Sequence, residues 1–173
     1  MKKMIRAVAT SLAVAAAFAA PTASATILTT ALNVDNYFYV YIATSDNQTG
    51  TFVGGGSDWG QTISHQWTLN KGTDYYLHVA GYDVDGTAAM LGQVSLSGSD
   101  HKFANGQTFL TTNRDFWTGN NVGFNGVYTT LTRAGANGDG PWGQQPGVSA
   151  NAEWIWAGHT VNNNASYFTT KIS

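Results

Sequence analysis

The chain contains no cysteine, so disulfides, thiolate metal sites and cysteine nucleophiles are all excluded. Only 10% of its residues are charged, and Glu153 is the single glutamate. After the first 25 residues, no stretch is apolar enough to span a bilayer. Stability must therefore come from burial and hydrogen bonding, and the polypeptide is not expected to insert into a membrane.

The N-terminus has the pattern of a secretory signal. A basic segment, MKKMIR, precedes the short apolar stretch AVATSLAVAAAFAA, and Ala23-Ser24-Ala25 offers a small-residue cleavage site. This predicts a signal peptide at residues 1–25 and one domain at residues 26–173. The protein is expected to be secreted, extracellular or at the cell surface, with the periplasm as an alternative.

The predicted mature chain is acidic. Removal of Lys2, Lys3 and Arg6 leaves five basic residues against ten acidic ones, a net charge of −5 with histidine neutral. That sign of charge argues against nucleic acids and anionic membrane surfaces as partners.

Composition and periodicity predict an all-β protein. Glycine is abundant, at 20 residues, and aromatics make up 13% of the chain; such usage favours strands and turns over helices. The clearest strand is 35–43, in which three tyrosines alternate with apolar residues, and 74–82 has the two-sided pattern of a central strand. A bulge is expected at Gly92. The expected strands are 27–32, 35–43, 51–53, 62–69, 74–82, 88–96, a short one near 109, 152–156 and 167–172, with residues 118–152 as a long loop.

Several segments, taken in order, resemble a known type of module. DNYFYVYI, GGGSDW, DYYLHVAGYD, AAMLGQVSL, LTTNRDFW, PWG, AEWIW and YFTTKI are similar to bacterial secreted β-sandwich modules of the galactose-binding-like, jelly-roll type, which also occur as accessory domains of glycan-degrading enzymes. The chain departs from that pattern in SDNQTG, where a shorter Asn-Gly hairpin is usual, and in YFTT, where YFR is usual. The resemblance implies a single jelly-roll β-sandwich.

Trp154 and Trp156 stand two apart, a spacing that places side chains on one face of a strand. In the resembling modules this strand belongs to the core. We therefore expect the two indoles to be mainly core residues rather than a ligand platform.

Catalysis finds little support in the sequence. The histidines His65, His78, His101 and His159 are scattered, and there is no G-x-S-x-G nucleophile motif. A glycosidase needs two neighbouring carboxylates, and nothing singles out a pair among Glu153 and the loop aspartates Asp58, Asp83, Asp85, Asp115 and Asp139. The protein is expected not to be an enzyme.

Asp83-Val84-Asp85-Gly86 begins like an oxygen-rich calcium loop, but Val94 stands where the loop would end in glutamate. An ordinary Asp-Gly turn is the favoured interpretation. Apart from this weak calcium candidate at Asp83 and Asp85, no cofactor is expected.

Two loop tryptophans have the surroundings of a sugar site, which combines a flat apolar face with polar groups. Asp58 and Trp59 lie in GGGSDWG, and Trp142 lies in GDGPWGQQPG. Each tryptophan could instead fold back over the end of the sandwich. The expected function is a non-catalytic carbohydrate-binding or cell-surface matrix module; a self-associating structural protein is the main alternative, and a small secreted hydrolase a remote one.

The signal sequence gives a first prediction. Mass spectrometry of the intact exported protein should show a chain beginning at Thr26, because the basic, apolar and small-residue regions occur in the required order. Exported protein that retains Met1 would contradict it.

Overall fold

The computed structural model describes residues 25–161 and 164–173, so the predicted signal segment lies outside the described residues apart from Ala25. The regular structure of the described part is entirely β, which confirms the predicted class. Within those ranges, no helix has the length and apolar character needed to cross a membrane.

The strands follow one another with short connections over the first half of the chain and longer ones over the second. They are β1 (Thr26–Asp35), β2 (Tyr37–Ala43), β3 (Thr51–Gly56), β4 (Ile63–Leu69), β5 (Tyr75–Tyr82), β6 (Ala89–Leu96), β7 (Phe109–Thr111), β8 (Thr118–Asn120), β9 (Leu131–Ala136), β10 (Glu153–Ala157) and β11 (Ala165–Ile172).

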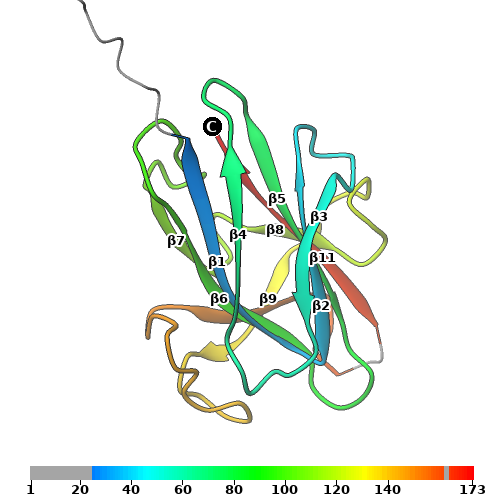
Figure 1. Cartoon of the computed structure of the whole chain (residues 1–173). Coiled ribbons are helices and arrows are strands. Elements are labelled where there is room, and N and C mark those ends of the chain that lie inside the picture. The colour runs from blue at the N-terminus through cyan, green and yellow to red at the C-terminus, as the bar shows by residue number, and fades with distance from the viewer. Residues whose placement is uncertain (1–24, 162–163) are drawn as a thin grey trace, which may run out of the picture.

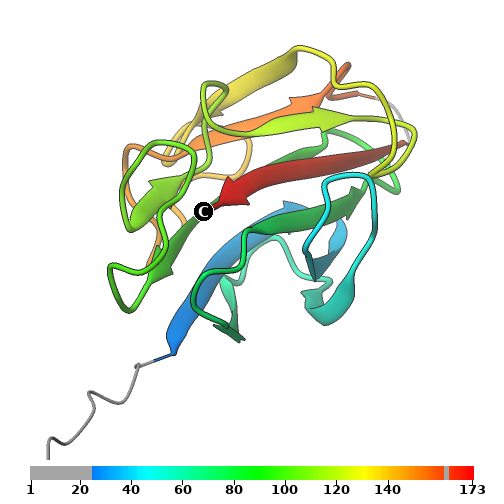
Figure 2. The ribbon, with the colours of Figure 1, turned by 90° about the horizontal axis from the view of Figure 1, so that it is seen from above.

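These strands form two antiparallel sheets that pack as a β-sandwich (Figures 1 and 2). The first, called sheet A, has the order β4-β1-β6-β10-β9, with β7 paired to β6. The second, sheet B, has the order β3-β2-β5-β11-β8. Strand β5 is therefore central in sheet B, as its two-sided pattern predicts.

The core lies between the sheets and is built by alternation. Phe38 and Val40 of β2 and Leu77 of β5 point inward from sheet B, and Leu32 and Met90 meet them from sheet A, all almost completely buried. Because side chains alternate along a strand, the neighbouring residues of β2 and β5 must face outward.

The two tryptophans of β10 are both fully buried, which confirms that they are core residues. They pack in different apolar clusters, however, at a point where β9 contributes one extra residue, Ala134, to its pairing with β10. Trp156 packs in the main core against Phe168, with ring centroids 5.6 Å apart. Trp154 belongs to a second apolar cluster and stacks on Trp142 at 4.4 Å.

The stretch 118–152, expected as a loop, contains the short strands β8 and β9. Its last part, from residue 137 to 152, folds over the outer face of sheet A at the lower end of the sandwich in Figure 1. There Trp142, Val148 and Ala152 cover Leu91 of β6. This segment is therefore a packed covering with its own small core.

The bulge expected at Gly92 is absent, because β6 pairs with β1 in continuous register through that residue. Glycine is required there for a different reason. A Cβ atom would lie 2.5 Å from the carbonyl oxygen of Ala31 on the neighbouring strand.

The core suggests a stability test. Trp156→Ala should lower the free energy of unfolding by about 3–5 kcal/mol, because the lost indole leaves a cavity between the sheets. Urea denaturation measures this, and Trp59→Ala is a suitable control because Trp59 is 40% exposed and lies outside the core clusters. Equal unfolding energies for the two variants would contradict the assignment.

Candidate ligand-binding face

The outer face of sheet B carries a concentration of aromatic side chains. Tyr37, Tyr39 and Tyr41 of β2 point outward, since they alternate with the core residues of that strand. In the ladders, Tyr37 lies opposite Tyr82 of β5, and Tyr39 lies opposite Ala80, which in turn lies opposite Tyr167 of β11. We call this surface the tyrosine face.

The aromatic rings on this face contact one another in a closed circuit. Successive centroids are 5.0–6.3 Å apart, a spacing at which edge and stacked contacts are favourable. The circuit runs through Tyr37, Tyr82, Tyr167, Phe124, Tyr41, Phe52 and Tyr39. These contacts hold each ring in place, so the face is formed before any ligand arrives.

Two loops rise over one end of the tyrosine face, 44–50 after β2 and 121–130 after β8. A hydrogen bond from the Tyr128 hydroxyl to Asp46 Oδ1 joins them. Phe124 of the second loop stacks on His78 of β5 at 4.4 Å and contacts Tyr41 at 5.8 Å. The loops are therefore anchored to the sheet and to each other.

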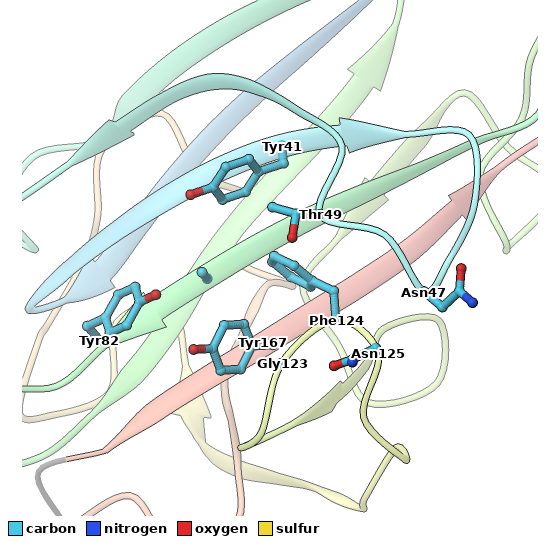
Figure 3. Close-up of a pocket in the computed structure, with 9 residues that line it drawn as sticks. Tyr41, Asn47, Thr49, Tyr82, Gly123, Phe124, Asn125 and Tyr167 are labelled. Carbon is cyan, nitrogen blue, oxygen red and sulfur yellow. The ribbon is translucent and has the colours of Figure 1, made fainter.

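Between these loops and the strands lies a hollow of about 400 Å³ (Figure 3), within the size range of small-ligand sites. Figure 3 shows Tyr41, Tyr82 and Tyr167 around its floor, and Asn47 and Asn125 on the loops at its rim. Phenol hydroxyls donate and accept hydrogen bonds, and the amides do the same through separate atoms. The lining thus combines flat apolar rings with neutral hydrogen-bonding groups.

Two phenols of this hollow, those of Tyr41 and Tyr82, have a raised pKa. Burial raises the pKa of Tyr82, and the adjacent Tyr167 adds to the effect. The pKa of Tyr41 is also raised, first by burial and then by Tyr39 and Tyr167. The hydroxyls of Tyr41 and Tyr82 therefore keep their protons for donation at physiological pH.

His78 lies beside the hollow on the outer side of β5, where Phe124 covers it, and it is fully buried. Its Nδ1 lies 2.8 Å from Thr169 Oγ1, while its Nε2 has no partner in the described part of the chain. Burial lowers the pKa of His78, an effect that the negative charge of Asp46 partly opposes. The ring is consequently neutral near pH 7 and serves as packing beneath Phe124.

The residues proposed from sequence, Asp58, Trp59 and Trp142, lie elsewhere, at the end of the sandwich where residues 137–152 fold over sheet A. Asn33 holds the two loops together: its Nδ2 donates to the Trp59 carbonyl at 2.9 Å and to Gln145 Oε1 at 2.9 Å. Gln145 in turn donates to the Trp142 carbonyl at 2.9 Å. The structure therefore brings both predicted loops to one place.

The side chains there are largely committed to the fold. Trp142 is only 5% exposed; one face covers Trp154, and its Nε1 donates to Asp35 Oδ2 at 2.8 Å. This matches the alternative in which the tryptophan folds back over the sandwich, and it leaves little indole surface for a sugar. Asp58 accepts a hydrogen bond from the Gly60 amide at 2.9 Å within its own turn. Trp59 alone of the three offers a partly exposed ring.

Asp83 and Asp85 lie in the turn after β5, near Asp35 at the end of β1. Asp83 is 4% exposed, and neither of its carboxylate oxygens has a hydrogen-bond partner in the described residues. Burial raises the pKa of Asp83, and the charges of Asp35 and Asp85 raise it further. No cluster of three histidines or acidic residues within the described ranges has the arrangement of a metal site. The calcium candidate thus stays a prediction.

Glu153 and His101, two of the groups considered for catalysis, are engaged in contacts of the fold. Glu153 is held by two arginines, with Arg133 Nε at 2.9 Å and Arg114 Nε at 3.6 Å. His101 is buried between Thr26 and the Thr73 carbonyl. These contacts give both residues a structural role.

No known protein family, curated protein or solved structure matches this chain. Its function must therefore be inferred from its own surfaces.

The tyrosine face is the feature that sequence reasoning missed. Alternation places the β2 tyrosines outward, and the same rule places His78 and Ala80 on one side of β5. What the pattern lacks is the register between strands, which sets Ala80 between Tyr39 and Tyr167. Composition favoured tryptophans as sugar platforms, whereas the structure assembles the larger face from tyrosines.

Asp83, in the acidic turn after β5, allows a test of how its buried carboxyl group affects stability. The pKa of Asp83 is raised in the folded state, so ionisation of its carboxyl group lowers the free energy of unfolding. The stability that the protonated carboxyl group contributes is present below its ordinary pKa and is lost as pH rises through the raised value. Asp83→Asn should therefore raise the free energy of unfolding at pH 7 by about 1–3 kcal/mol. The gain should shrink toward pH 4, as urea titrations at several pH values would show.

Thermal unfolding in calcium chloride and in a chelator tests the metal candidate at Asp83 and Asp85. We expect the two melting temperatures of the parent protein to agree closely. A calcium-dependent rise that Asp83→Asn abolishes would establish a cation at this turn.

Proposed function

We propose that this protein is a secreted, non-catalytic carbohydrate-binding module, acting at the cell surface or in the extracellular matrix, and that it binds glycans on the tyrosine face. The observation that carries the proposal is the hollow of about 400 Å³ lined by Tyr41, Tyr82 and Tyr167 with amides at its rim.

The chemistry of that hollow suits a sugar. A pyranose presents flat patches of C–H groups, which pack on aromatic rings, and hydroxyls around its edge that both donate and accept hydrogen bonds. The phenols and the Asn47 and Asn125 amides offer hydrogen-bond donors and acceptors to match these hydroxyls. Since the rings already support one another, little ordering free energy has to be spent on binding.

The finer fold assignment belongs to the same proposal. The two antiparallel sheets agree with the jelly-roll, galactose-binding-like type that the motifs resemble, and the signal sequence supports export from a bacterium. A binding module without catalytic groups is consistent with the structural roles of Glu153 and the buried histidines.

Self-association is the second candidate, and a specific feature favours it. Strand β3 is an edge of sheet B, and its Phe52 is 56% exposed, so this edge offers apolar surface to another copy. Val122 and Val127 add exposed apolar surface on the adjoining loop.

A glycan array followed by calorimetry tests the proposal. The parent protein should bind at least one glycan with micromolar to millimolar affinity, and Tyr167→Ala should weaken binding by roughly tenfold or more, since it removes a ring from the floor. Trp59→Ala is the matched control: it removes an exposed aromatic ring from the other predicted site and should leave affinity unchanged.

Loss of binding in Trp59→Ala with full binding in Tyr167→Ala would move the site to the sandwich end. A parent that binds no glycan but forms larger species with concentration in size-exclusion chromatography would favour the structural alternative.

A further inference from the structure

A second hollow adjoins the first on the tyrosine face. It has a volume of about 430 Å³ and lies over Tyr37, Tyr39 and the edge strand β3, where Phe52 forms one wall. Phe52 also contacts Tyr41, whose ring lines the first hollow, at 5.7 Å, and Tyr39 at 6.2 Å. The two hollows therefore share a continuous aromatic wall.

Small residues keep both floors open. Ala80 lies in the first hollow, between the strands that carry Tyr39 and Tyr167. In the second hollow, a Cβ atom at Gly55 would lie 2.4 Å from the Phe38 carbonyl oxygen and 3.0 Å from the Tyr39 ring. Backbone packing thus requires glycine at that position, and the surface beside Tyr39 remains open as a result.

Among the described residues, none that lines either hollow carries a charge. Asp46, which lies beside the first hollow, accepts a hydrogen bond from the Tyr128 hydroxyl. Lys171, farther along β11, forms an ion pair with Asp74 at 2.8 Å. It lines a different hollow, which two carboxylates also line. An anionic sugar would consequently lose hydration without gaining a cationic partner, which is unfavourable.

We infer that the ligand is an uncharged oligosaccharide at least two sugar units long, which occupies both hollows at once. This inference rests on the proposed function and adds the charge and the length of the glycan. One unit lies over Ala80 within the tyrosine floor, and the next stacks on Tyr39 and Phe52.

Calorimetry with defined oligosaccharides tests the inference. Gluco-, manno-, galacto- and xylo-oligosaccharides of one to four units would be compared with oligogalacturonides of the same lengths. Affinity for the preferred neutral series should rise roughly tenfold or more between one and three units and then level off, because further units extend beyond the two hollows. The uronates should bind at least roughly tenfold more weakly at every length, and the neutral series should be insensitive to salt.

Phe52→Ala tests the contribution of the second hollow to binding. It removes one wall of the second hollow at an exposed position, so the trisaccharide should lose most of its advantage in affinity over the monosaccharide. Phe109→Ala is the matched control, because Phe109 is an exposed phenylalanine on β7 of sheet A. It should leave both affinities intact.

The outcomes distinguish this inference from the proposal beneath it. Equal affinity at all lengths, or stronger and salt-sensitive binding of uronates, would overturn the two-hollow, neutral-ligand inference while leaving glycan binding on the tyrosine face intact. Absence of binding to every series would count against the proposed function itself.

Discussion

The ladder between β2 and β5 is the interaction on which the rest of the structure depends. It pairs the two strands from Tyr37 opposite Tyr82 to Ala43 opposite Tyr76. Its inner face supplies Phe38 and much of the core, and its outer face supplies the tyrosines. A slip of one residue would exchange the two faces. Burial of the core therefore fixes the register that assembles the tyrosine face. The stability of the fold and the proposed binding site thus have the same origin.

The absence of disulfides explains where the large side chains are placed. Without a covalent link, a single domain must bury enough apolar surface to offset its chain entropy. Strand β10 serves this need by dividing its tryptophans, with Trp156 in the core between the sheets and Trp154 under the segment 137–152. Trp142 closes the second cluster and donates to Asp35. The segment 137–152, whose sequence resembled a recognition loop, thus packs over sheet A.

The sequence was sufficient for the class and for the longer strands: burial along β2 and β4 alternates with a period of two, and β5 is buried on both sides, as its two-sided pattern predicts. It was insufficient for β8 and β9, whose residues TGN and LTRAGA show no alternation. It also could not place the irregular pairing of β9 with β10, since a bulge depends on the partner strand. The same limit applies to the site, because the contacts that surround Ala80 join segments that are distant in sequence, β2, β5, β11 and two loops.

Charge is segregated from the proposed site. Three carboxylates, Asp35, Asp83 and Asp85, gather where β1 ends and β5 turns, and the pKa of Asp83 is raised by burial and then by its two neighbours. The adjacent residue on β5, Tyr82, alternates to the opposite side and faces the neutral hollow. The overall negative charge makes copies of the protein repel one another, which opposes association through the exposed aromatic rings. An uncharged sugar experiences no such repulsion. The combination of a neutral aromatic face with an acidic remainder therefore favours a neutral ligand over a second copy of the chain.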